Sequence, residues 1–302
     1  MSRRKTLLGA TALSLAGAAG CLVPASSLSA STVPTITIGS TNFTEQVIVA
    51  NLYADALQHA GFKTHLRADL GTRTAVEPAL AHGALDLYPD YAGSLLIFLE
   101  PKDTTQATQL STDIPALTSA LNAQGATVLN PAPAVDTNVF AVTKATAAKY
   151  HLTTLSSLVP VASKLVLGGP PECPTYAYCL LGLERVYGLH FKSFLSTDEA
   201  GPITIADLKN GRVQVAELFS SDGSIVQNGF VQLTDDKHLQ PADHLIPVVR
   251  KSVDTPAVAA ALNAVSAKLT TQQLEGLNID VNVDHDVPAA VAAKWLKTEG
   301  LT

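Results

Sequence analysis

The sequence is poor in several residue types whose abundance marks particular protein classes. Its 302 residues contain three cysteines, one methionine and one tryptophan, and only 15% of them are charged. No dense block of lysine and arginine suggests a nucleic-acid surface. Beyond the N-terminus, no apolar run reaches the roughly 20 residues that a membrane-spanning helix needs. These absences, with 47% hydrophobic residues, favour a globular protein with no expected nucleic-acid partner.

Common catalytic motifs are also missing. The sequence has no Gly-x-Ser-x-Gly elbow, no His-Glu-x-x-His helix and no Walker phosphate loop. The sequence does not identify a general base that could activate Ser220 or Ser221 beside Asp222. The two histidines that flank Asp243 are too few ligands to predict a metal site. We therefore expect no enzyme, no metal and no cofactor. A hydrolase or metal-dependent surface enzyme is the less favoured alternative, and an adhesive surface protein is a third.

The N-terminus predicts export. Basic residues 3–5 precede an apolar run over residues 7–19, which is typical of a secretory signal. The four residues that end at Cys21 resemble a bacterial lipobox, in which the cysteine is acylated, although the usual leucine is missing. Ordinary cleavage near Ala30 is the alternative. We expect a leader and tether over residues 1–33 and a lipid anchor on the extracytoplasmic (periplasmic or cell-wall) side of the cell membrane.

The other two cysteines are Cys173 and Cys179. An exported protein folds where disulfides are permitted, so if Cys21 carries lipid the remaining pair is expected to be bonded. Zinc ligation is the alternative, but no histidine or further cysteine lies close in sequence to complete a site.

Strand and helix signals alternate along the chain, which predicts parallel sheets covered by helices. Ligands of such sheets bind beyond the carboxyl ends of the strands, here at residues 40–42 and 89–94. Strands are expected at 35–38, 63–70, 85–88, 139–143, 164–168 and 212–218, and helices at 44–59, 75–81, 181–187, 203–209, 257–269 and 288–296.

The simplest arrangement is two α/β lobes, the second inserted into the first. We expect lobe I to comprise residues 34–136 and 244–302, and lobe II residues 137–243, with chain crossings near 133–138 and 239–247.

An internal repeat supports two matched lobes. Residues 79–91 align with residues 207–219 at a constant offset of 128 positions. Each copy predicts a helix end, a left-handed glycine (Gly83 or Gly211), a strand and an aromatic residue just after it. If the lobes face each other across a cleft, Tyr91 and Phe219 are facing aromatics. Coincidence is the alternative, since helix-Gly-strand units are common in α/β folds.

Several segments resemble those of the osmoprotectant-binding proteins of ABC importers, in order from about Thr35 to the C-terminus. They are Gly39–Gln46, Asp86–Ser94, Leu180–Leu189, Phe219–Gly223, Asp235–His238 and Pro247–Arg250. The resemblance implies a two-lobed periplasmic-binding-protein fold (type II) with a ligand cleft between the lobes. It also implies a monomer that captures glycine betaine, choline or a similar quaternary amine and delivers it to the transmembrane subunits of an ABC permease.

The resemblance implies an aromatic cage for the ammonium group, because a cation lies favourably over ring faces. Tyr91 and Phe219 match cage positions, whereas Asn138 and Asp243 stand where the family has aromatic rings. Tyr176 replaces an arginine that grips a betaine carboxylate. The expected ligand contacts are Thr41, Asn42, Tyr91, Ser94, Asp136, Asn138, Tyr176, Phe219 and Asp243.

The departures leave the solute open. Asp136 and Asp243 would suit a cation such as choline better than a betaine. The alternative is an uncharged polyhydroxy or aromatic solute held by polar side chains. Each residue also has a purely structural alternative: Asn42 as a helix cap, Asp136 and Asp243 as solvated hinge residues, Tyr176 as a surface aromatic and Phe219 as part of the core.

Overall fold

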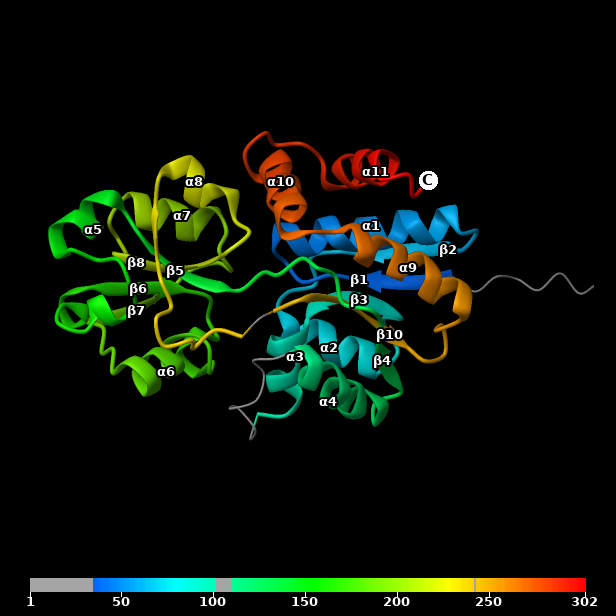
Figure 1. Ribbon diagram of the computed structural model, residues 1–302, viewed down its shortest axis with the longest axis horizontal. Helices are drawn as coiled ribbons and strands as arrows, with labels where there is room; N and C mark the ends of the chain where they lie inside the picture. Colours follow the sequence, from blue (N-terminus) through cyan, green and yellow to red (C-terminus); the bar gives the residue numbers. More distant parts are fainter. Residues whose placement is uncertain (1–34, 102–109, 242) are drawn as a thin grey trace, which may run out of the picture. The chain divides into compact units, whose positions relative to one another are not determined.

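The computed structural model describes residues 35–101, 110–241 and 243–302, and these form two five-stranded sheets (Figure 1). The first sheet, in the order β2-β1-β3-β10-β4, contains β1 (Thr35–Gly39), β2 (Lys63–Arg67), β3 (Leu87–Tyr91), β4 (Ala126–Val128) and β10 (Leu245–Arg250). The second, in the order β7-β6-β8-β5-β9, contains β5 (Asn138–Val142), β6 (Val166–Gly169), β7 (Ser193–Ser196), β8 (Val215–Phe219) and β9 (Val231–Leu233).

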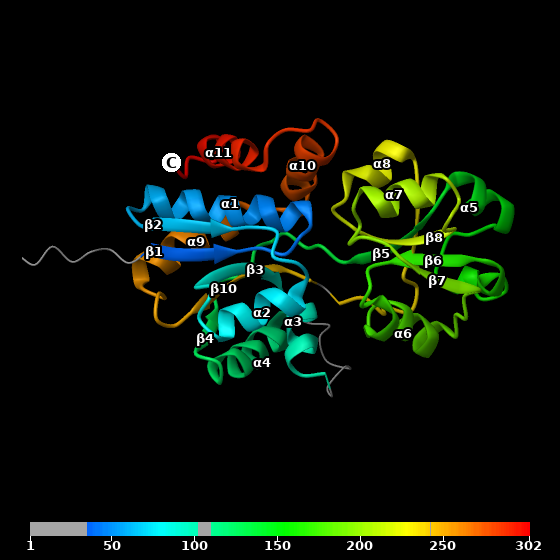
Figure 2. The same ribbon diagram turned by 180° about the vertical axis from the view of Figure 1, so that it is seen from behind.

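Helices cover both faces of the first sheet (Figures 1 and 2). One face carries a layer of four helices, in which α1 packs against each of the other three. The apolar side chains of these four helices form one core. The opposite face carries three helices that share a second core. The first layer is α1 (Thr44–His59), α9 (Pro256–Lys268), α10 (Thr271–Asn282) and α11 (Pro288–Thr298); the other is α2 (Arg73–Ala81), α3 (Ala92–Leu99) and α4 (Leu110–Asn122).

The second sheet has shorter helices. In both views α7 and α8 lie on one side of it and α6 on the other. These elements are α5 (Lys144–Tyr150), α6 (Leu180–Gly182) with a π-helical turn (Leu183–Tyr187), α7 (Pro202–Lys209) and α8 (Gly223–Asn228), besides single 3₁₀ turns at Ser156–Leu158, Ala162–Lys164 and Cys173–Thr175.

Each sheet has three parallel strands on one side and an antiparallel strand next to them. β1 pairs in parallel with β2 and β3, and β6 pairs in parallel with β7 and β8. β10 runs antiparallel to β3 and β4, and β5 runs antiparallel to β8 and β9. The expected parallel strands are therefore present, but β5 and β10, the strands that follow the two chain crossings, enter their sheets in the reverse direction.

The chain passes between the sheets in two paired segments. Val135 and His244 form an isolated antiparallel bridge, and the Asp136 amide donates to the Asp243 carbonyl over 2.9 Å. Asp136 and Asp243, which are distant in sequence, therefore enter the same region of the molecule.

The internal repeat corresponds to matched structural units. β3 and β8 begin and end 128 positions apart. Gly83 and Gly211 follow α2 and α7 with φ of 79° and 73°, the left-handed conformation that glycine adopts without strain. Tyr91 and Phe219 are the last residues of β3 and β8 rather than the first residues beyond them.

Some elements differ from the sequence-based expectation. The strand expected at 85–88 lies at 87–91, and the helix expected at 181–187 is one α-turn followed by a π-turn. α3 was not expected, because its first six residues are all buried and therefore show no polar face.

Candidate functional site

The carboxyl ends of the central strands meet at a cavity of about 240 Å³. Eight of the nine residues expected to contact the ligand line it: Thr41, Tyr91, Ser94, Asp136, Asn138, Tyr176, Phe219 and Asp243. Asn42 is exposed and is not among the lining residues. It does not cap α1 either, since the N-cap residue is Phe43 and no side chain caps it.

Phe43 links the two matched aromatic residues. Its ring centroid is 6.2 Å from that of Tyr91, with the rings 21° apart, and 4.8 Å from that of Phe219. The sequence-based picture of Tyr91 and Phe219 facing each other omitted this third ring. Phe43 lies inside the segment Gly39–Gln46 that carries the family resemblance, so the resemblance was the signal that could have found it. Phe98 and Tyr176 add further rings to the cavity wall.

A buried glutamate lies behind the aromatic rings. Glu45 accepts hydrogen bonds from the Tyr91 hydroxyl, the Ser221 hydroxyl and the Asn278 amide, the last over 2.7 Å. Burial raises the pKa of Glu45, and these three donors oppose that shift. Because Ser221 follows β8 whereas Glu45 belongs to α1, this network joins elements of the two sheets.

Asp243 orders one end of the cavity. Its carboxylate accepts from the Ser94 amide over 2.8 Å and from the Ser94 hydroxyl over 2.5 Å, and Tyr176 donates to that hydroxyl over 3.0 Å. Asp243 is 4% exposed, and burial raises its pKa to about 6 in spite of these donors. Asp243 therefore titrates near neutral pH instead of serving as a solvated hinge residue.

Asp136 has a similar environment on the neighbouring crossing segment. It accepts from the Ser220 hydroxyl and the Ser221 amide, both over 2.9 Å. Burial and the nearby Glu45 raise its pKa well above the ordinary range. Asn138, two residues later, pairs with Phe219 across β5 and β8, which places both side chains on one face of the second sheet.

One guanidinium group reaches the cavity. Arg73, the first residue of α2, donates to Asp90 through Nη2 over 2.6 Å and through Nε over 3.0 Å. It is the one basic residue among the described residues that line the cavity, whereas six lining residues carry carboxyl groups. The sequence offered no sign of Arg73, because only the fold brings the start of α2 next to the end of β3.

Three of these carboxyl groups, those of Glu172, Glu199 and Glu217, come from the second sheet. Burial raises the pKa of Glu217 well above the ordinary range and raises the pKa of Glu199 to about 7. Repulsion from the neighbouring glutamates raises both pKa values further. Sequence reasoning did not identify any of the three.

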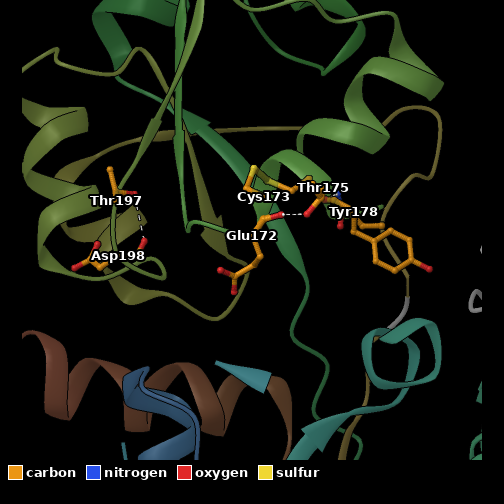
Figure 3. The surroundings of a disulfide bond; sticks show 8 residues. Glu172, Cys173, Thr175, Tyr178, Thr197 and Asp198 are labelled. Atoms are coloured by element: carbon orange, nitrogen blue, oxygen red, sulfur yellow. Dashed lines mark hydrogen bonds between the residues drawn. A yellow bond between two sulfur atoms is a disulfide. The ribbon is translucent and has the colours of Figure 1, made fainter. Parts of the chain in front are cut away.

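A disulfide joins Cys173 and Cys179 and forms part of the cavity wall (Figure 3). The loop that it closes carries Tyr176, which meets Tyr178 edge to face with centroids 5.7 Å apart. The two sulfur atoms and a Glu217 oxygen lie within 4.8 Å of one another. Because both sulfur atoms are bonded to each other, they do not form a thiolate metal site.

Two further observations concern the membrane. No helix in the described ranges has the length and apolar character needed to cross a bilayer. Cys21, the expected lipidation site, lies outside the described residues.

Two sheets joined by paired crossings, with a ligand cleft between two lobes, define a type II periplasmic-binding-protein fold. Residues 34–298 match the family model for the substrate-binding domain of ABC-type glycine betaine transport systems, and the chain belongs to this family. It is therefore a substrate-binding protein of an ABC transporter, and the family acts outside the cytoplasm.

The relatives agree with this assignment. The chain is 30% identical to the glycine betaine-binding protein YehZ of Escherichia coli over 88% of this chain and 91% of that protein. It is 28% identical to a glycine-betaine-binding protein of Pseudomonas aeruginosa over 88% of each. The crystal structure of a glycine betaine/carnitine/choline ABC transporter shares the fold with a TM-score of 0.68, at 23% identity over 88% of this chain and 99% of that one.

Proposed function

We propose that this protein captures a small organic cation in the 240 Å³ cavity and delivers it to the transmembrane subunits of an ABC permease. The observation that carries the proposal is the composition of the cavity wall, which combines aromatic rings with six carboxyl groups and one guanidinium. Ring faces attract a quaternary ammonium by roughly 0.5–2 kcal/mol each. Carboxyl groups around the rings add attraction for any positive charge.

The same charges disfavour a betaine. A betaine carries a carboxylate, which requires a cationic or strongly donating partner. Arg73 already donates to Asp90 through two nitrogen atoms, and a carboxylate that took it over would leave the Asp90 charge buried without its partner. We therefore expect choline, which has a hydroxyl group in place of the carboxylate, to bind better than glycine betaine, although the two relatives are named for glycine betaine.

Capture requires the cleft to open and close. We propose that residues 34–136 with 244–302 move as lobe I and residues 137–243 as lobe II, hinged at the paired crossings of Val135 and His244. The hydrogen bonds of Glu45 to Ser221 and of Tyr176 to Ser94 join the proposed lobes and would stabilise the closed form.

We further propose that the protein is a monomer without enzymatic activity that a lipid on Cys21 holds at the cell membrane. Mass spectrometry of the natively expressed protein should find an acylated Cys21 as the N-terminus. A mature chain that begins near Ala30 would show that the anchor is wrong.

The experiment that tests the proposed function is calorimetry with choline and glycine betaine on wild type and two Tyr91 variants. Tyr91→Ala should weaken choline binding by about five- to thirtyfold, because it removes one ring face. Tyr91→Phe is the matched control: it keeps the ring, loses the hydrogen bond to Glu45 and should change the affinity by less than about threefold. Tight glycine betaine binding that Tyr91→Ala does not affect, or tight binding of an uncharged solute alone, would overturn the proposal.

A further inference from the structure

Three carboxyl groups gather at one edge of the second sheet. β7, β6 and β8 are adjacent and parallel, with Gly169 paired to Ser196 and Gly168 paired to Ala216. Glu172 and Glu199 lie in the loops that follow β6 and β7, and Glu217 is the middle residue of β8. The carboxyl ends of parallel strands meet at the same edge of a sheet, and all three residues line the ligand cavity next to that edge. We call these three residues the acidic corner.

Glu217 is the most buried member of the acidic corner. It is 5% exposed and makes no side-chain hydrogen bond or ion pair with any residue in the described ranges. Glu199 is similar, since its Oε2 is buried and has no hydrogen-bond partner there. A buried carboxyl group without a hydrogen-bond partner is destabilising, so the ligand-free protein carries a cost that a ligand can relieve.

The fold keeps space for the Glu217 carboxylate. A Cβ atom at Gly169 would come within 3.3 Å of Glu217 Oε2 and 3.4 Å of Cys173 Sγ. The disulfide closes one side of the acidic corner, within 4.8 Å of a Glu217 oxygen, and Figure 3 shows the Glu172 carboxylate pointing away from that disulfide. The open side of Glu217 is therefore the cavity.

The partner of these carboxyl groups has to come from outside the wall. Arg73, the one basic residue among the described lining residues, is held by Asp90. A quaternary ammonium has no N–H to donate, and its favourable partner is a ring face. An ammonium or guanidinium group with N–H bonds matches carboxylate acceptors in charge and in hydrogen bonding.

We propose that the acidic corner of Glu172, Glu199 and Glu217 binds a primary ammonium or guanidinium group of the transported solute. This inference rests on the proposed function and extends its substrate class from quaternary amines to organic cations with N–H donors, such as diamines and guanidino amines. The titration of the corner agrees with this assignment. Burial and repulsion among the three glutamates raise the pKa of Glu217 and of Glu199. Asp90 also raises the pKa of Glu199, and Arg73 lowers it. A bound cation would reverse these shifts and release protons.

Calorimetry with agmatine, putrescine and choline tests the inference on wild type, Glu217→Gln and Glu199→Gln. Each variant is nearly isosteric, removes a carboxyl group whose ionisation burial disfavours and should fold at least as stably as wild type. We expect Glu217→Gln to weaken agmatine and putrescine binding by at least about tenfold, the usual worth of a charge-assisted hydrogen bond. Choline, which has no N–H bond to donate, should weaken by a smaller factor than agmatine and putrescine in the same variants. Glu184→Gln is the matched control, because Glu184 is exposed and is not among the residues that line the cavity, and it should leave all three affinities unchanged.

The outcomes separate this inference from the proposed function. Agmatine binding that is unchanged in both variants, or choline binding without any agmatine or putrescine binding, would overturn the inference and leave the proposed function standing. Failure of all three cations to bind the wild-type protein would overturn both. A purely structural role for Glu217 would raise the melting temperature of Glu217→Gln and leave all affinities unchanged, which would also overturn the inference.

Discussion

Asp243 should make the affinity for choline depend on pH. Its carboxylate is buried, and its pKa of about 6 reflects burial that the Ser94 donors only partly offset. At pH 5 roughly a tenth of the molecules would carry an ionised Asp243, and at pH 8 nearly all would. A cation in the cavity favours the ionised form, so choline binding should tighten by up to about tenfold between pH 5 and pH 7 and release protons. Arg73 and Asp90 face Asp243 with opposite effects on its pKa, and Glu199, with a pKa of about 7, should extend the rise towards pH 8.

The same shift has the opposite consequence for the ligand-free protein. A raised carboxyl pKa contributes stability that is fully present below the unfolded pKa of 3.8 and is lost as the pH rises through about 6. This difference corresponds to about 3 kcal/mol in the free energy of unfolding. Asp243→Asn keeps an acceptor for the Ser94 amide and removes the titration, so it should flatten both pH profiles.

The assay is calorimetry with choline at pH 5, 6, 7 and 8 in two buffers of different ionisation enthalpy, alongside urea unfolding without ligand. A buffer-dependent heat that disappears in Asp243→Asn is the expected result. Choline affinity that falls with rising pH, or an identical pH profile in the variant, would refute the reasoning.

Two further perturbations test other parts of the site. Phe43→Ala should weaken choline binding by about two- to thirtyfold, because the ring lines the cavity and contacts both Tyr91 and Phe219. Phe62→Ala, at a half-buried phenylalanine outside the cavity lining, should lower stability only, and equal affinity losses of the two variants in calorimetry would contradict this. Replacing Cys173 and Cys179 together by serine should lower the free energy of unfolding by about 2 kcal/mol, as expected for a disulfide that closes so short a loop. It should also weaken choline binding, because that loop holds Tyr176 in the cavity wall. Unchanged urea unfolding would contradict this.

The local parts of the fold were predictable from the sequence. Helix-glycine-strand units carry their own signals, so the matched units ending at Tyr91 and Phe219 could be placed. The two sheets and their crossings followed from the alternation of these signals. α3 was missed because complete burial removes the periodicity from which a helix is predicted.

The cavity was predictable in part. Residues that directly follow strands, such as Thr41, or that lie at the crossings, such as Asp136 and Asp243, do line the cavity. Arg73 and Glu217 were missed for a physical reason: their place in the wall depends on which way a helix start or a strand residue faces, and long-range packing decides this. Phe43 was overlooked inside a segment that had already been identified.

A crystal structure of the complex with choline tests the central claim most directly. The account predicts the ammonium group in the 240 Å³ cavity, within about 6 Å of the ring centroid of Tyr91. Phe43, Glu199 and Phe219 also line a neighbouring cavity between α7, α8 and α10. Choline in that neighbouring cavity, beside Lys209, Gln227 and Asn282 and away from the Tyr91 ring, would contradict the account.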